Sequence, residues 1–333
     1  MSDRASPGTL RFAAHGGHCE ADLHLPQAPG AGPHPVVVMA HGIGAERDWG
    51  LAPFARRFSE RGIAALVFDY RHFGGSSGTP RRLVSPSRQL ADYRAALSFV
   101  REDPRLDATR VGLWGTSFSG GHVLRLATEA PAGVRAVVSQ IPFVSGLAST
   151  LAFPLRYHLP AIALGLADTL RGLLGLEPLT VPVVRQRGLA LLASPDSLDG
   201  YRALLPGNER PPPVPARTFL QVLRYHPGRH ASRNPIPTLV LGASDDEVCP
   251  IGATRRVAAR LPRGRIEELP IGHFDVYRGD WFEKASTRAT AFLWEHLAPD
   301  APGSALDHRT QNPDHHLEVD QESHHVHDRG DPG

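Results

Sequence analysis

The chain has 333 residues, of which 41% are hydrophobic, so it is long enough to bury the core of one large domain. Its 36 Lys and Arg nearly balance 34 Asp and Glu, and without a long basic run this composition argues against nucleic acid as a partner. Its two cysteines, Cys19 and Cys249, are too far apart in sequence for a disulfide framework or a zinc site, which favours a reducing, cytoplasmic setting.

The first residues predict an unstructured start followed by the edge of a sheet. Residues 1–8 are expected to be disordered, and they lack the apolar core of a secretory signal. The segments near 9–14 and 18–25 alternate polar and apolar residues, which is typical of antiparallel strands. We therefore expect the folded domain to span residues 9–298 and to open with an antiparallel edge.

Short apolar runs then alternate with helical patterns. The predicted strands lie at residues 35–40, 63–70, 110–115, 134–140, 237–243 and 264–269. Nearly continuous apolar strands of this kind are typical of a parallel sheet that is covered on both faces. Amphipathic helices are predicted at 50–62 and 86–103, the second with Pro86 at its first position and Ser85 as a candidate cap. The alternation predicts a doubly wound α/β fold.

Two stretches break this alternation. From about 142 to 234 the sequence becomes helical and punctuated by proline, which predicts a cap inserted over the sheet. Its most apolar part, 159–176, contains Asp168 and Arg171 and is therefore a poor membrane span; we expect a buried or pocket-lining helix. Residues 299–333 are rich in His, Asp, Pro and Gly, which predicts a disordered tail rather than a metal site. The histidines concerned are His315, His316, His324, His325 and His327.

The stretch "LWGTSFSGG" (113–121) places Ser117 directly after a predicted strand and before a predicted helix. This is the setting of a nucleophile elbow, in which a sharp, strained turn exposes the serine hydroxyl. Such a turn needs small residues two positions away on either side, and here these are Gly115 and Ser119. Alone, the motif is as compatible with an ordinary glycine-rich loop as with a nucleophile.

Three other loops strengthen the catalytic interpretation. "HGIG" follows the strand at 35–40, so Ile43 and the residue after the serine, Phe118, are candidate backbone donors to an oxyanion. "GASDDEVCP" offers Asp245 and Asp246 at the end of a strand, and "PIGHFDVY" offers His273 after the next strand. Active sites of open α/β sheets collect at this carboxyl edge.

The motifs "DYRHFGGSSGTPR", "LWGTSFSGGHV" and "HFDVY" together resemble the α/β-hydrolases over about residues 10–298. The similarity is to a serine-hydrolase branch near dienelactone-hydrolase-like and X-Pro-dipeptidyl-peptidase-like esterases and polyketide acyltransferases. It implies an α/β-hydrolase fold with a helical cap, and acyl transfer through a serine ester with an aspartate-oriented histidine as base. The family's spacing of acid to proline favours Asp246 over Asp245, since Pro250 stands four residues later.

The leading hypothesis is a cytoplasmic serine hydrolase that cleaves a small-molecule ester, lactone or thioester with an apolar acyl group, without cofactor or metal and without a membrane partner. Transfer of the acyl group to an alcohol or amine is the alternative, because such acceptors attack the same acyl-enzyme as water. A non-catalytic binding protein is less favoured, because Ser117, Asp246 and His273 occur in the expected order. The natural substrate and the oligomeric state are left open.

Overall fold

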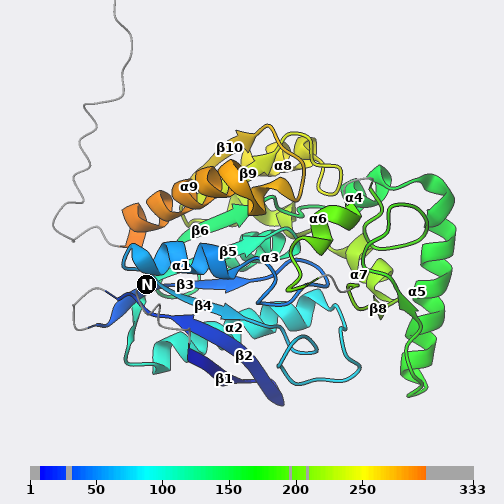
Figure 1. Cartoon of the computed structure of the whole chain (residues 1–333), viewed down its shortest axis with the longest axis horizontal. Coiled ribbons are helices and arrows are strands. Elements are labelled where there is room, and N and C mark those ends of the chain that lie inside the picture. Colours follow the sequence, from blue (N-terminus) through cyan, green and yellow to red (C-terminus); the bar gives the residue numbers. More distant parts are fainter. Residues whose placement is uncertain (1–7, 28–31, 195–196, 208–209, 298–333) are drawn as a thin grey trace, which may run out of the picture. The chain divides into compact units, whose positions relative to one another are not determined.

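An eight-stranded, mostly parallel sheet forms the centre of this computed structural model, which describes residues 8–27, 32–194, 197–207 and 210–297. The spatial order is β1-β2-β4-β3-β5-β6-β9-β10 (Figure 1). β1 pairs antiparallel with β2, and β2 with β4, whereas the other neighbours are parallel, so the predicted antiparallel edge and α/β class are confirmed. The strands are β1 (Gly8–Ala14), β2 (Gly17–His24), β3 (His34–Ala40), β4 (Ala64–Phe68), β5 (Leu106–Thr116), β6 (Val134–Gln140), β9 (Thr238–Ala243) and β10 (Gly264–Leu269).

Helices cover both faces of the sheet. They are α1 (Ala52–Glu60), α2 (Pro86–Glu102), α3 (Phe118–Ala127), α8 (Ile251–Ala258) and α9 (Gly279–Leu297). Successive strand residues alternate between two cores: in β5, Leu113 joins the core that includes α2 and α3, and Trp114 joins the core that includes α1 and α9. Because both faces are buried, the strands are continuously apolar, as the sequence predicted.

The start of α2 follows the predicted proline signal. Pro86 is the first helical residue, and Ser85 precedes it in an extended conformation. The Ser85 side chain accepts no hydrogen bond from the helix backbone and instead lies 3.3 Å from the Ser87 hydroxyl. Ser85 therefore precedes the helix as predicted, but its side chain does not cap the helix with a hydrogen bond.

Between β6 and β9 the chain forms a separate group of elements, which we call the cap (Figure 1). Its elements are α4 (Gly146–Ala152), η1 (Leu155–Tyr157), α5 (His158–Leu173), β7 (Thr180–Val181), α6 (Ser197–Arg202), β8 (Val214–Pro215), α7 (Thr218–Arg224) and η2 (Pro227–Arg233). A small antiparallel pair, β7–β8, interrupts the helices. Asp168 connects α5 to the segments around Leu179 and Arg217. Its carboxylate accepts hydrogen bonds from Leu179 N and from the Arg217 backbone and guanidinium.

The expectation that residues 159–176 form a buried helix is wrong for most of its surface. α5 turns Gly165 and Asp168 inward, whereas Leu159 and Leu173 are 79% and 80% exposed. Asp168 is buried because its partner Arg217 lies beneath the helix, so the polar residue occupies the side that apolar residues usually take. The pocket-lining half of the prediction applies to Ala161 and Ile162, which line a cavity.

No helix among the described residues is long and apolar enough to cross a membrane. The predicted disordered segments, 1–8 and 299–333 with the five tail histidines, lie outside the described residues except for Gly8, which begins β1.

Candidate active site

Ser117 occupies a sharp turn between β5 and α3. Its backbone has φ 54° and ψ −117°, a conformation that L-residues rarely adopt and that stores strain. The turn is held by backbone bonds to the next strand and its loop: Ser117 N donates to Gln140 O, and Phe143 N donates to Ser117 O, each at 2.9 Å. A Cβ at Gly115 would lie 2.2 Å from the carbonyl oxygen of Ser119, so this position requires glycine. The local geometry is that of a nucleophile elbow.

The side chains of Ser117, His273 and Asp246 form one chain of hydrogen bonds. His273 Nε2 lies 3.0 Å from Ser117 Oγ, and His273 Nδ1 lies 2.7 Å from Asp246 Oδ2. All three residues are at most 9% exposed, although they come from the separate loops after β5, β9 and β10. With Nδ1–H donating to Asp246, Nε2 presents its lone pair to the serine hydroxyl, which is the arrangement that general-base activation needs.

The two aspartates of "GASDDEVCP" have different surroundings. Asp246 is buried, and its Oδ1 accepts hydrogen bonds from Val248 N at 2.8 Å and Cys249 N at 2.6 Å, which leaves Oδ2 for the histidine. Asp245 is exposed, and its backbone N–H donates to Ile271 O. The structure therefore brings Asp246, and not Asp245, to His273. Asp275, two residues beyond His273, accepts a hydrogen bond from Gly272 N and supports the histidine loop.

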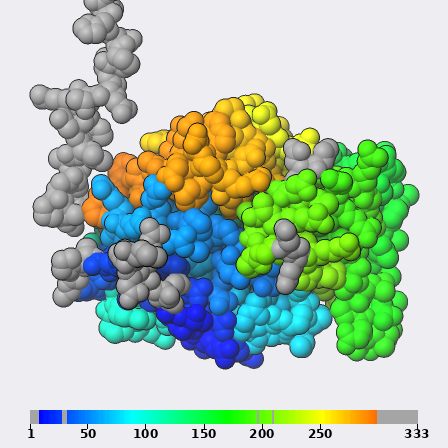
Figure 2. All heavy atoms as spheres, in the orientation of Figure 1, coloured from blue at the N-terminus to red at the C-terminus, as the bar shows by residue number. Residues whose placement is uncertain are grey.

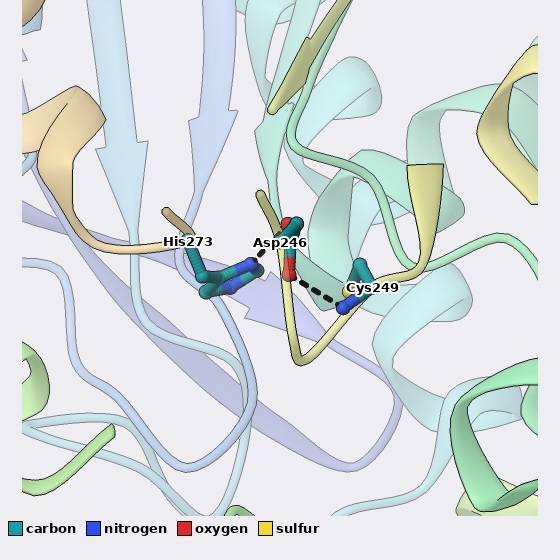
Figure 3. Close-up of side chains that lie close together, drawn as sticks. All are labelled: Asp246, Cys249 and His273. Carbon is teal, nitrogen blue, oxygen red and sulfur yellow. Dashed lines mark hydrogen bonds and ion pairs between the residues drawn. The ribbon is translucent and has the colours of Figure 1, made fainter. Parts of the chain in front are cut away.

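Cys249 also lies beside these residues, and Figure 3 shows it next to Asp246 and His273. One donor atom from each lies within 4.8 Å of the others, so the group has the types and spacing of a metal site. However, the Asp246 oxygens and His273 Nδ1 already bond one another or backbone amides. Burial also raises the pKa of the Cys249 thiol well above its ordinary value, which disfavours the thiolate that a metal requires. These contacts favour a hydrogen-bonded triad over a metal centre.

The "HGIG" loop after β3 lies directly against the nucleophile turn. A Cβ at Gly42 would lie 3.2 Å from Ser117 Cβ, so any larger residue here would crowd the nucleophile. Ile43 and Phe118 both line the same cavity as Ser117. Phe118 is the first residue of α3, where backbone N–H groups have no partner within the helix. The two expected oxyanion donors are thus neighbours of the serine.

The cavity above Ser117 has a volume of about 670 Å³ and is mainly apolar. Most of its wall comes from the cap, including Leu147, Leu151, Ile162, Leu191, Leu192 and Val222. Of the described residues that line it, none is a lysine or an arginine, and Asp246 and Glu247 are its acids. Such a cavity suits an uncharged, apolar group of drug-like size.

Sequence reasoning missed the side chains that hold the "HGIG" loop. The carbonyl of Ile43 accepts a hydrogen bond from the Tyr201 hydroxyl of the cap at 2.9 Å, and the carbonyl of Gly44 accepts one from the Arg82 guanidinium. His41 is buried and interacts with the loop itself, as expected for a structural histidine, since its Nδ1 lies 2.9 Å from Gly42 O. The partners of this loop are distant in sequence, so no local motif identifies them.

Comparison with known proteins identifies the family of the chain. Residues 16–167 match the model of the X-Pro dipeptidyl-peptidase (S15) family. The quorum-quenching protein AidA of Acinetobacter baumannii is 40% identical over 290 residues, which cover 86% of this chain and 94% of AidA. The thiohydrolase aneE of Aspergillus aculeatus is 30% identical over 298 residues, covering 83% of this chain and 89% of aneE. Other matched relatives include polyketide transferases.

Among solved structures, the alpha/beta hydrolase GrgF from Penicillium sp. sh18 superposes with a TM-score of 0.74 at 22% identity, covering 88% of this chain and all of GrgF. Fold and relatives together define an enzyme of the α/β-hydrolase class. The chain belongs to the α/β-hydrolase superfamily, in the serine-hydrolase branch of AidA, the thiohydrolases and the polyketide transferases.

Proposed function

We propose that this protein is a serine hydrolase that cleaves a small-molecule carboxylic ester, lactone or thioester with a medium-sized apolar acyl group, by way of an acyl-enzyme. The observation that carries the proposal is the continuous hydrogen-bond chain from Ser117 through His273 to Asp246, which opens into an apolar cavity. The hydrolase and transferase names of the relatives point to the same group of reactions.

The proposed reaction begins when the Ser117 hydroxyl attacks the carbonyl carbon of the substrate and His273 Nε2 takes its proton. The negative oxygen of the tetrahedral intermediate then accepts hydrogen bonds from the backbone N–H groups of Ile43 and Phe118. His273 returns the proton to the departing alcohol or thiol, and Asp246 stabilises the imidazolium in the meantime. Water activated by the same histidine then releases the acid.

The apolar cap wall supports an uncharged acyl chain as the recognised group. A carboxylate or phosphate on that chain would meet Asp246 and Glu247 without a lysine or arginine among the described lining residues. Burying such a charge unpaired is costly, whereas each buried methylene is favourable by about 0.8 kcal/mol. We therefore expect kcat/KM to rise with acyl length until the cavity is full.

This expectation is tested with p-nitrophenyl esters of increasing acyl length, together with the matching thioesters. The expected profile rises from acetate to a medium-chain optimum, and an ester whose chain ends in a carboxylate is at least about tenfold poorer than its neutral counterpart. A rate independent of chain length and charge would contradict the role given to the cavity.

Acyl transfer is the second candidate, since relatives include polyketide transferases and the same acyl-enzyme serves both reactions. The two outcomes are separated by adding alcohol or amine acceptors during turnover and measuring the ratio of transferred to hydrolysed product. A ratio that saturates with acceptor concentration indicates a bound acceptor and favours a transferase. A ratio that rises only in proportion to concentration favours a hydrolase.

A further inference from the structure

The helix that follows Ser117 carries a buried hydroxyl for which the triad has no use. Ser119 is completely buried, and its hydroxyl donates a hydrogen bond to the carbonyl oxygen of His41. The Tyr70 hydroxyl, also completely buried, lies 2.5 Å from Ser119 Oγ. Because the single Ser119 proton is directed to His41, Tyr70 donates to Ser119. The relay therefore runs from Tyr70 through Ser119 to the backbone of the "HGIG" loop.

Four consecutive carbonyls of this loop accept hydrogen bonds from side chains. The pairs are His41 O with Ser119, Gly42 O with His41 Nδ1, Ile43 O with Tyr201, and Gly44 O with Arg82. Burial lowers the pKa of His41 to about 4, so at neutral pH its ring carries one proton, which Nδ1 donates to Gly42 O. Such a set of bonds fixes the rotation of each peptide plane in the loop.

The direction of a carbonyl sets the direction of the amide in the same peptide plane. In a trans peptide the C=O and the following N–H point in opposite directions. The bond to Gly42 O therefore orients the N–H of Ile43. The bond to His41 O orients the peptide before it, which ends in the N–H of Gly42, the residue next to Ser117. Preorganised donors are effective because they need not reorient as negative charge develops.

We propose that Ser119 is a positioning residue for the oxyanion donor: its hydroxyl holds the His41–Gly42 peptide, and His41 Nδ1 holds the next peptide, Gly42–Ile43, so that the Ile43 N–H faces the oxygen that becomes negative during attack by Ser117. This inference rests on the proposed function. It also assigns a role to the small residue two positions after the nucleophile, which gives the turn room and in addition orients a loop 78 residues away in sequence.

The test compares Ser119→Ala with Ser139→Ala. Ser139 is a matched control, because it is also completely buried and its hydroxyl donates to a backbone carbonyl, that of Gly120, at 2.8 Å. Both variants lose a similar bond, but only one of these bonds holds the "HGIG" loop. We expect Ser119→Ala to lower kcat about 10- to 100-fold with little change in KM, and Ser139→Ala to stay within about twofold of wild type.

A second readout separates positioning from general damage. Ser117 adds to the carbonyl carbon of an apolar trifluoromethyl ketone, its proton passes to His273 and the ketone oxygen becomes an oxyanion. The alcohol obtained by reducing the same ketone has no carbonyl and only fills the cavity. For Ser119→Ala, affinity for the ketone should fall by the same factor as kcat, with affinity for the alcohol unchanged. Equal losses for both ligands, or equal kcat for the two serine variants, would overturn the proposal.

Tyr70→Phe covers the case in which Ser119→Ala does not fold. It removes the donor to Ser119 but leaves the bond from Ser119 to His41, so kcat should fall only about two- to fivefold, and an unchanged kcat would count against the relay. Ser117→Ala is measured in parallel. An inactive wild type overturns the proposed function itself, whereas activity that depends on Ser117 but not on Ser119 overturns only this inference.

A different observation concerns the outer side of the cap. The helix α5 lies at the outer edge of the cap (Figures 1 and 2). We call the exposed large apolar side chains from Leu155 to Leu174, on η1 and α5 and just after them, the cap face. Leu159, Leu166 and Leu173 are 79%, 54% and 80% exposed. The one acid within α5, Asp168, is turned inward to Arg217. A continuous apolar surface of this kind is unusual on a monomer and marks an interaction site.

The spacing on the cap face favours another helix as its partner. Leu155, Leu159, Ile162, Leu166, Leu170 and Leu173 follow one another at steps of three or four residues, which is the pattern of a helix–helix seam. Ala163 and Ala167 lie exposed beside it and allow close approach. A second copy of this chain offers the same uncharged stripe, so two cap faces related by a two-fold axis meet without burying a charge.

An anionic lipid surface suits the cap face less well. Recognition of such lipids relies on clusters of Lys and Arg beside the apolar surface. Here Arg156 stands at one end, and Arg171 is half-buried with its Nε donating to Glu177 O. Leu151 and Ile162 line the cavity and are also exposed, so a second copy on this face would in addition cover the outer wall of the substrate cavity.

We infer that the cap face is the interface of a homodimer. The test is sedimentation velocity of the full chain and of the Leu159→Glu/Leu166→Glu double variant. The control is Ser87→Glu, which adds a charge at an exposed position of α2, away from the cap face. We expect the wild type and the control to sediment as dimers and the double variant to sediment as a monomer. Circular dichroism should show that the double variant is folded. A monomeric wild type, a dimer that survives both charges, or binding of a monomer to phosphatidylglycerol vesicles would overturn the inference.

Discussion

The carboxyl edge of the sheet and the cap line the same cavity but differ in burial and hydrogen bonding. At the sheet edge, Ser117, His273 and Asp246 are buried and bonded to one another, and Ser117 and Asp246 are also held by backbone amides and carbonyls. In the cap, wall residues such as Leu147 and Leu151 are 54% and 67% exposed. The comparison assigns the chemistry to the rigid edge and the choice of substrate to the cap.

The largest effect is expected at the sheet edge, from Asp246→Asn. An asparagine amide cannot orient the imidazole as a carboxylate does, and in serine proteases the same change lowers kcat about 10⁴-fold. We expect a loss of about that size here, measured as steady-state hydrolysis of a p-nitrophenyl ester. Asp245→Asn is the control and should stay within about twofold, since Asp245 is exposed and does not contact His273. Equal losses in the two variants would contradict the assignment of Asp246 as the acid that orients His273.

In the cap, Asp168→Asn should lower stability more than activity. The carboxylate is fully buried and bonded to the partly exposed guanidinium of Arg217, so the change removes a charge-assisted hydrogen bond and costs about 2 kcal/mol. Hydrogen exchange should show faster opening of α5 and α7, while hydrolysis of a short acetate ester stays near wild type. Glu129→Gln removes the partly exposed pair with Arg94 and should cost less than about 1 kcal/mol.

Substrate choice should change when the cap wall grows into the cavity. Ala161→Phe places a ring on the cavity side of α5, so kcat/KM for medium-chain esters should fall about tenfold while acetate ester hydrolysis changes little. Ala291→Phe is the control, since Ala291 is exposed on α9 and lines neither the cavity nor the cap face. If both variants changed the chain-length profile equally, the assignment of selectivity to the cavity wall would be wrong.

The smallest expected effect concerns His122, which joins the two regions. Its Nε2 lies 3.1 Å from Gln89 Oε1, and its Nδ1 lies 2.6 Å from the hydroxyl of Tyr225 in the cap. Burial, with a smaller contribution from His41, lowers the pKa of His122 to about 3. The folded state thus favours the neutral ring, so its stabilising contribution is complete above about pH 6.5 and is lost as pH falls toward 3.

We expect the wild type to lose about 1 kcal/mol more stability than His122→Gln between pH 7 and pH 5.5, since His122 in the unfolded chain gains about two thirds of a proton there that the folded chain does not bind. Urea unfolding at the two pH values measures the difference. Identical pH dependence of the two proteins would show that His122 is protonated in the folded state.

Sequence reasoning worked best where one local pattern determines the structure. The β-branched runs predicted the strands because both faces of the sheet are buried, and the order of Ser117, Asp246 and His273 identified residues that the fold brings together. It failed on α5, because apolar content does not say which side of a helix faces the protein, and the position of Arg217 reversed the expected orientation. The hydrogen bond of Ser119 could not be predicted because its partner, His41, belongs to another loop.

The central claim is that Ser117 is the nucleophile, and covalent labelling tests it most directly. A fluorophosphonate probe reacts only with a serine that a neighbouring base has activated. Intact mass spectrometry should show one adduct on the wild type, located at Ser117 by peptide mapping, and none on a folded Ser117→Ala variant, which should also have lost hydrolysis of p-nitrophenyl esters. Unchanged labelling of Ser117→Ala, or an adduct on another residue, would contradict the account.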